Sequence, residues 1–233
     1  MMRSPPILLT LLLALGLSAC APQQQERPFQ MRNLAKSDID MVTDAHIAEV
    51  NRLSRELMLK LYRRNPRELA KAPPGTTIAQ RMYQLFEFPR KTRFSELNNR
   101  YGVHAVPLAF DPTFKGDRVM ALMVGISGMI HSAYNGQDEF FMLDEIDQQK
   151  LYNSARNLEK IAWQLNNARQ ENGELFLYSN GLSEVGIENL SFARTFGKLI
   201  ALQDMMARIV ADTQNRTINK VLHGAASTVL LPI

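Results

Sequence analysis

The chain has 233 residues, 45% apolar and 21% charged, with a formal net charge of +4 and one cysteine. This composition is close to that of globular domains and supplies enough apolar side chains for a core, so it excludes a wholly disordered chain. The charge is too small to indicate nucleic-acid binding, and a single cysteine excludes a fold held by intramolecular disulfides.

The first nineteen residues have the pattern of an export signal. Arg3 supplies a positive charge, and an apolar stretch of 11 residues follows at 7–17. A helix needs about 20 residues to cross a hydrocarbon core of ~30 Å, so this stretch is too short for a membrane span and fits a signal peptide. It ends at Leu17-Ser18-Ala19-Cys20, which is an apolar residue, two small residues and the cysteine.

This four-residue sequence resembles the lipobox of bacterial lipoproteins. The resemblance implies cleavage before Cys20, a diacylglycerol on the Cys20 sulfur and acylation of the new amino group, and two or more acyl chains anchor a protein stably. Ala21 stands where an aspartate tends to retain enterobacterial lipoproteins at the inner membrane. In a bacterium with two membranes, the resemblance therefore implies an outer-membrane protein that faces the periplasm. The alternative is an ordinary signal peptide followed by a chance cysteine.

The segment after the cysteine is rich in glutamine and proline and has no apolar periodicity, which predicts a flexible tether. The predicted organisation has three parts. Residues 1–19 form the signal peptide, residues 20–36 form the lipidated N-terminus and tether, and residues 37–233 form a single helical domain.

Helical periodicity begins at Ser37, where Ser37–Asp40 resembles a capping box. Apolar residues then recur every three or four positions up to Leu61, except at His46. This pattern predicts a long amphipathic helix that ends near Asn65, because Pro66 disfavours helix at the residue before it.

A second capping box at Thr77–Gln80 predicts a shorter helix that continues to Phe86. Residues 88–114 contain prolines and glycines and have no clean period. We expect mostly loop there, with a short helix after Ser95 and an extended segment at Val103–Phe110.

Residues 119–130 form the most apolar segment after the signal. This segment is too short to cross a bilayer, and a helix that is apolar on every side is usually a buried central helix. Ala121 and Gly125, four residues apart, would let a neighbouring helix approach closely.

Three more helices are expected, at about 144–169, from Phe192 to Thr213 and from Ile218 to Val229. The breaks between helices are short, which favours antiparallel neighbours. The prediction is an all-α bundle of about six helices with long antiparallel neighbours, preceded by the tether.

Two groups of residues suggest chemistry only weakly. Gly125-Ile126-Ser127-Gly128 partly matches the nucleophile elbow of hydrolases, but Met129 replaces the final glycine and no strand–helix alternation surrounds it. The histidines are too far apart in sequence for a zinc motif, and the acidic residues between 138 and 147 lack calcium-loop spacing. We interpret the Gly125–Gly128 sequence as part of a packed helix, His46 as a buried residue and the acidic residues as a solvated helix entrance. We therefore predict no metal and no cofactor.

Basic residues gather where the first long helix ends. A candidate contact patch for lipid phosphates or an acidic partner comprises Lys60, Arg63, Arg64 and Arg67. The alternative is a solvated helix end whose cations interact favourably with the helix dipole. The methionines invite a similar choice between an adaptable binding groove and core packing, and their helical spacing favours the core.

No set of catalytic residues converges in the sequence, so we predict a non-enzymatic outer-membrane lipoprotein. Its periplasmic bundle would bind an envelope protein partner or scaffold an envelope assembly, and Cys20 would attach it to the membrane. One alternative is a carrier of apolar ligands such as acyl chains, in a cavity lined by residues 119–130 and the methionines. A second alternative is a hydrolase that uses Ser127 and one histidine.

Overall fold

A computed structural model describes residues 38–141, 146–182, 186, 188–214, 218 and 229–233. The signal segment, Cys20 and the tether lie outside these residues. Residues 36–233 belong to one compact unit, and the description below concerns that unit alone.

The described residues are mostly helical, and the predicted all-α fold class is confirmed. The α-helices are α2 (Asp38–Arg64), α3 (Pro66–Leu69), α4 (Ile78–Phe86), α5 (Arg118–Ala133), α6 (Gln148–Asn167) and α7 (Ser191–Gln214). Three 3₁₀ turns lie between α4 and α5, at Ser95–Leu97 (η3), Gly102–His104 (η4) and Val106–Phe110 (η5). A small antiparallel hairpin of β1 (Gly181–Leu182) and β2 (Glu188–Asn189) precedes α7.

Local sequence signals set the helix ends. The predicted capping box is present, because the Thr77 side chain accepts from Gln80 N and the Gln80 side chain accepts from Thr77 N. Asp117 caps α5 by accepting from Met120 N, and Asp147 caps α6 in the same manner. The first long helix ends at Arg64, just before Asn65 and Pro66, as the sequence predicts.

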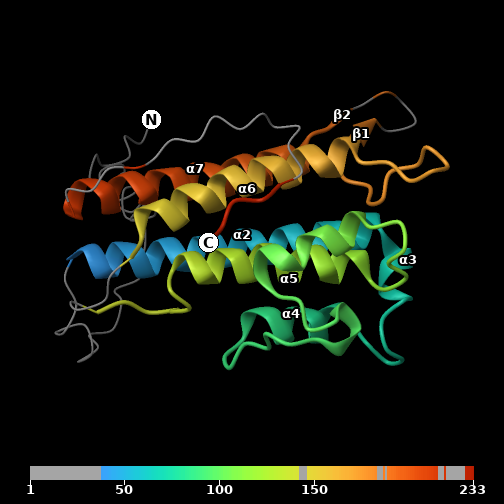
Figure 1. The fold of residues 1–233 in the computed structure, drawn as a ribbon, viewed down its shortest axis with the longest axis horizontal. Coiled ribbons are helices and arrows are strands. Elements are labelled where there is room, and N and C mark those ends of the chain that lie inside the picture. The colour runs from blue at the N-terminus through green and yellow to red at the C-terminus, as the bar shows by residue number, and fades with distance from the viewer. Residues whose placement is uncertain (1–37, 142–145, 183–185, 187, 215–217, 219–228) are drawn as a thin grey trace, which may run out of the picture. The chain divides into compact units, whose positions relative to one another are not determined.

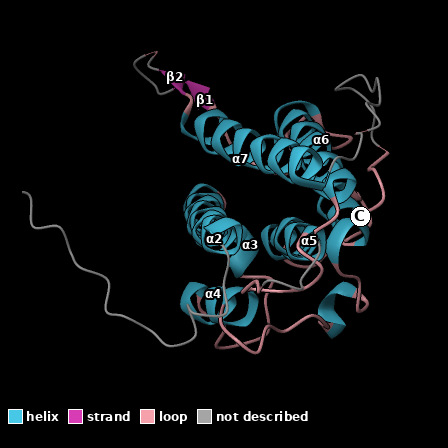
Figure 2. Cartoon of the chain, turned by 90° about the vertical axis from the view of Figure 1, so that its left-hand side faces the viewer, coloured by secondary structure: helices cyan, strands magenta, loops and turns pink. Residues whose placement is uncertain are grey.

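The helices form layers (Figures 1 and 2). Helices α6 and α7 lie side by side in one layer, α2 and α5 form the next, and α4 lies beyond them. Neighbours within a layer are antiparallel. His46 meets Tyr134 while Tyr62 bonds to Asp117, so α2 and α5 run in opposite directions. The long antiparallel neighbours that the sequence predicts are therefore present.

Helix α5 occupies the centre, and its residues from Arg118 to Ile130 are all buried. The predicted central helix is confirmed. No helix among the described residues combines the length and the hydropathy needed to cross a membrane.

Two glycines let the chain cross α5 closely. A Cβ atom at Gly125 would lie 2.4 Å from Val106 Cγ2 in η5, and one at Gly128 would lie 2.8 Å from the backbone nitrogen of Gly102 in η4. Gly102 itself has a positive φ of 55°, a conformation that glycine adopts without strain. The small residues of the Gly125–Gly128 sequence therefore serve packing.

The extended segment expected at Val103–Phe110 is wrong, since these residues form 3₁₀ turns η4 and η5. Arg118 supplies a physical reason. Its Nη1 donates to the carbonyl oxygens of Leu108, Ala109 and Asp111, so one buried guanidinium gathers three carbonyls that an extended strand would hold apart.

The last helix expected from the sequence, from Ile218 to Val229, is not helical at either of its two ends. Ile218 and Val229 are not helical, and the residues between them lie outside the described part of the chain. Residues 229–233 instead run as an irregular segment against α6, through side chains described below.

The crossing at Gly128 predicts a stability difference between two glycines. We expect Gly128→Ala to lower the free energy of unfolding by about 1–3 kcal/mol, because the new methyl group meets backbone that cannot move away. Gly197→Ala in α7 is the matched control, since nothing lies within 4 Å of its added Cβ. The control should raise the free energy of unfolding by up to about 1 kcal/mol through helix propensity. Urea unfolding measures both, and a stabilising Gly128→Ala would contradict the crossing.

Candidate functional site

A buried polar cluster lies at the N-terminal end of α5. Asp117 accepts a hydrogen bond of 2.7 Å from the Tyr62 hydroxyl and lies 3.6 Å from Arg81. Arg81 forms two hydrogen bonds of 2.5 and 2.7 Å to the Glu96 carboxylate, and its side chain is 2% exposed. Burial raises the pKa of Asp117 to about 6, against the lowering effect of its hydrogen bonds from Met120 N and Tyr62 and of the Arg81 charge.

A second buried carboxylate lies beside the same helix end. Glu68 accepts from Lys71 Nζ at 2.8 Å and from the backbone nitrogen of Arg118 at 3.0 Å. Both Glu68 and Asp117 are therefore placed where the positive end of the α5 dipole favours negative charge. The bonds of this cluster join α2, α3, α4 and the start of α5 to one another, which gives the cluster a structural role.

The candidate nucleophile does not have the required geometry. Ser127 lies inside helix α5 and is 7% exposed, whereas a nucleophile elbow presents its serine on a turn between a strand and a helix. The hydrolase alternative therefore loses its nucleophile.

The described histidines lie in separate settings. His46 is buried against Tyr134, with ring centroids 6.1 Å apart, as the packed-interface interpretation predicts. Within the described residues, its Nε2 has no hydrogen-bond partner, and burial lowers its pKa to about 4. His131 lies 4.0 Å from Asp138, His104 is exposed in η4, and His223 lies outside the described residues. No metal-binding group of acidic, histidine or cysteine side chains occurs in the described part of the chain.

The acidic residues after α5 have individual partners where they are described. Asp138 pairs with Arg90, and Asp147 caps α6. Asp144 and Glu145 of the same group lie outside the described residues.

The structure divides the predicted basic patch. Lys60 lies against α7, where Nζ is 2.5 Å from Glu56 and donates to Thr195 Oγ1 at 2.9 Å. Arg67 stacks on the Tyr178 ring at 5.3 Å. Arg63 and Arg64 are exposed. Arg67 is exposed as well, so the three arginines at the end of α2 and the start of α3 present an exposed basic surface, whereas Lys60 belongs to the α2–α7 interface.

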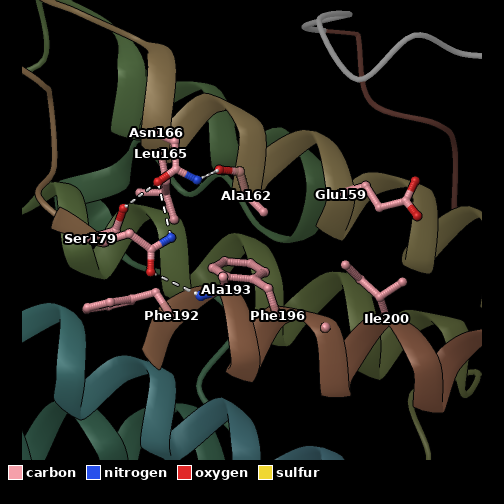
Figure 3. A pocket seen from close by; sticks show the side chains of 11 residues that line it. Glu159, Ala162, Leu165, Asn166, Ser179, Phe192, Ala193, Phe196 and Ile200 are labelled. Atoms are coloured by element: carbon pink, nitrogen blue, oxygen red, sulfur yellow. Dashed lines mark hydrogen bonds between the residues drawn. The ribbon is translucent and has the colours of Figure 1, made fainter. Parts of the chain in front are cut away.

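A pocket lies between α6 and α7 (Figure 3). Its volume is about 250 Å³. Aromatic and aliphatic side chains from both helices line its interior, namely Ala162, Leu165, Phe192, Phe196 and Ile200. The missing side chain of Gly197 leaves the α7 side open.

Polar groups mark the two ends of this pocket. At one end, Asn166 Oδ1 accepts from Ser179 Oγ and Asn180 Nδ2, both at 3.3 Å, and Asn180 Oδ1 accepts from Ala193 N at 3.2 Å (Figure 3). At the other end is Glu159, whose pKa is raised mainly by burial. The interior of the pocket is apolar, and its ends carry amide and carboxylate groups. This arrangement suits a ligand in which an apolar part lies next to a polar group.

The pocket continues along α7 as a shallow groove. Gly197 and Ile200 line both, and the groove extends past Ala201 to Ile209. Met205, 48% exposed, lies in it. The pocket and this continuation are called the α6–α7 groove below.

Comparisons with protein-family models, curated proteins and solved structures find no match to this chain. No activity, ligand or partner can therefore be transferred to the α6–α7 groove from a relative. Its size and chemistry must identify the class of molecule that fits it.

The pocket, at about 250 Å³, is smaller than most sites that enclose a small molecule, which have about 300–1,000 Å³. It is open along α7, where it continues into a second hollow of about 490 Å³, so the groove as a whole extends along this helix. A cavity lined by residues 119–130, which the carrier alternative requires, gains no support. The hollow described beside Ile130 and Tyr134 holds only about 10 Å³.

Sequence reasoning did not find the α6–α7 groove. Its polar end comes from Ser179 and Asn180, which approach α6 only because the chain between α6 and α7 folds back on itself. Gly197 was one available signal, because glycine inside a predicted helix costs about 1 kcal/mol relative to alanine and so invites a question about what lies against it.

Proposed function

We propose that this chain is an outer-membrane lipoprotein, anchored through acyl chains on Cys20 and facing the periplasm. Its helical body binds an envelope protein partner through the α6–α7 groove and performs no catalysis. The lipobox-like sequence supports the anchor. The α6–α7 groove is the observation that carries the binding function, since it begins in an open, apolar pocket of about 250 Å³ with polar ends between two packed helices.

The groove has the features of a side-chain pocket at a protein interface. Phe192 and Phe196, both buried in the fold, form part of its apolar lining, and aromatic and aliphatic anchors of a partner pack well against such a lining. The polar rim contains Glu159, Asp204 and Arg208. Polar rims around apolar centres are typical of interfaces between proteins. Exposed Arg63 and Arg64 lie on α2 and are available to anionic headgroups or to acidic side chains.

The test is a crosslinking experiment in cells that combines membrane fractionation with palmitate labelling. Wild-type protein should take up labelled palmitate, fractionate with membranes and crosslink to one stoichiometric protein. Cys20→Ala should lose the label and leave the membrane fraction. Gly197→Leu should stay on the membrane but lose at least about 90% of the crosslinked partner, because its side chain fills the mouth of the groove.

Lys198→Leu is the matched control for the groove. It adds the same side chain at the next, exposed position of α7, which does not line the groove, and the partner should be retained. Palmitate-free wild-type protein would refute the anchor, and equal crosslinking of Gly197→Leu and Lys198→Leu would refute the groove.

A further inference from the structure

A polar ladder on α6 holds the last segment of the sequence. Asn153, Asn157 and Lys160 lie at spacings of four and three, which places them on one face of the helix. All three are buried, and Asn157 is 0% exposed. Their side chains all bond to residues 229–233.

The ladder bonds to backbone atoms of that segment. Asn157 Nδ2 donates to Leu231 O at 2.9 Å, and Asn157 Oδ1 accepts from Leu231 N at 2.6 Å. Asn153 Nδ2 donates to Pro232 O at 2.8 Å, and Lys160 Nζ donates to Val229 O. One amide therefore satisfies both backbone groups of Leu231, as a neighbouring β-strand would.

This kind of bonding recognises the backbone of a segment with apolar side chains. Leu231 is buried, Leu230 and Ile233 pack partly against the core, and Val229 is 69% exposed. The bonds to the backbone place few demands on side-chain identity, while the buried leucine requires an apolar residue at one position. Recognition of peptides in an extended conformation uses the same division of roles.

The seat of the segment is open on one side. A hollow of about 580 Å³ lies between residues 229–233 and η4–η5, where Val103, His104 and Pro107 line it. If the segment left, Asn153, Asn157 and Lys160 would lose their backbone partners in it. Water or a second segment of the same kind can satisfy these side chains in its place.

We propose that this face of α6 is a binding groove for an apolar segment, and that residues 229–233 of a second copy of the chain bind there in exchange for the chain's own segment. The same sequence then makes the same contacts in trans, which is the low-cost route to a dimer. The 14 residues from 215 to 228 can span up to about 50 Å, longer than any helix of the described fold. This inference does not depend on the lipid anchor or on the α6–α7 groove.

The test combines two complementary full-length variants. One carries Asn157→Leu, which removes the central hydrogen bonds of the binding face of α6 but leaves residues 229–233 unchanged. The other carries Leu231→Asp, which prevents its own segment from binding but keeps the groove. In the mixture, only one combination is intact. Residues 229–233 of the Asn157→Leu chain can bind the α6 face of the Leu231→Asp chain. In native mass spectrometry, the mixture should contain at least about tenfold more mixed dimer than the homodimer found in a solution of either variant alone.

A peptide measurement separates folding failure from failure of the proposal. A fluorescent peptide with the sequence of residues 227–233 should bind the Leu231→Asp chain, and the same peptide carrying Leu231→Asp should bind at least about tenfold more weakly. Circular dichroism verifies that both chains are helical. Absence of peptide binding to a folded Leu231→Asp chain would overturn the groove. Peptide binding without a mixed dimer would overturn the second copy as the source of the segment.

Discussion

Replacing Glu96 with alanine is expected to lower the free energy of unfolding by about 3 kcal/mol. The substitution leaves the guanidinium of Arg81 buried without its main partner, and breaking a buried ion pair from one side costs about 3–5 kcal/mol. The low end applies because Glu96 is 23% exposed and Asp117 stays 3.6 Å from Arg81. Burial alone would lower the pKa of Arg81, but the bonds to Glu96 outweigh it and the pKa is raised, so the buried charge persists.

Two controls make this result specific. Glu49→Ala breaks a pair with Arg52 at 2.7 Å on the exposed side of α2, and urea unfolding should show no measurable change, because water replaces the interaction. The double variant Arg81→Met with Glu96→Ala removes the buried charge together with its partner. It should be at least about 1 kcal/mol more stable than Glu96→Ala alone. Equal losses in the single and double variants would show that packing, not charge, holds this site.

The second large effect is a pH-dependent stability that depends on His46. The pKa of His46 is lowered from 6.5 to about 4 in the folded chain. Between pH 4 and pH 6.5, His46 is therefore protonated in the unfolded chain and neutral in the folded chain. The stabilising contribution of neutral His46 is therefore present above pH 6.5 and is lost as the pH falls toward 4. The loss amounts to about 3 kcal/mol.

Asp117 acts in the opposite direction. Its pKa is raised from 3.8 to about 6, so its burial costs stability above pH 6, and acidification relieves about 2 kcal/mol of that cost. In the wild-type protein, the contributions of His46 and Asp117 to the free energy of unfolding change in opposite directions and nearly cancel. These two groups should therefore change the stability little between pH 7 and pH 4. Each single variant should reveal the effect of the group that remains.

The measurement is urea unfolding at pH 7 and pH 4 for the wild type, His46→Leu and Asp117→Asn. The His46→Leu variant should gain stability on acidification relative to wild type, and Asp117→Asn should lose it. Asp117→Asn keeps a side-chain oxygen to cap α5, which separates the charge effect from the cap. Parallel curves for the wild type and His46→Leu would refute the buried neutral imidazole.

The helices were predictable because their signals are local. The capping box at Thr77, the proline at Pro66 and the wholly apolar run from Val119 to Ile130 each determine structure within one or two turns. The sequence also predicts the burial of His46 correctly, since it lies on the apolar stripe. It does not reveal that Nε2 lacks a partner, because that depends on which side chains of α5 pack against it.

The sites were not predictable because they require contacts between distant segments. Asn153, Asn157 and Lys160 are polar residues on a helix whose apolar stripe, including Leu151 and Leu158, had already been assigned to the core. Nothing in their spacing indicates that residues some 70 positions later bind to them. Likewise, the sequence places Lys60 in a candidate contact patch for lipid phosphates or an acidic partner, and only the packing of α7 on α2 puts it in an interface.

The position of α5 affects how the molecule opens. Its residues are covered by α2, by α4, by η4 and η5, and by α6, which come from both earlier and later parts of the chain. No single element can detach and expose it fully. We therefore expect its amide protons to exchange with deuterium through cooperative opening of the whole unit, so the exchange rate of α5 should report the global stability of that unit.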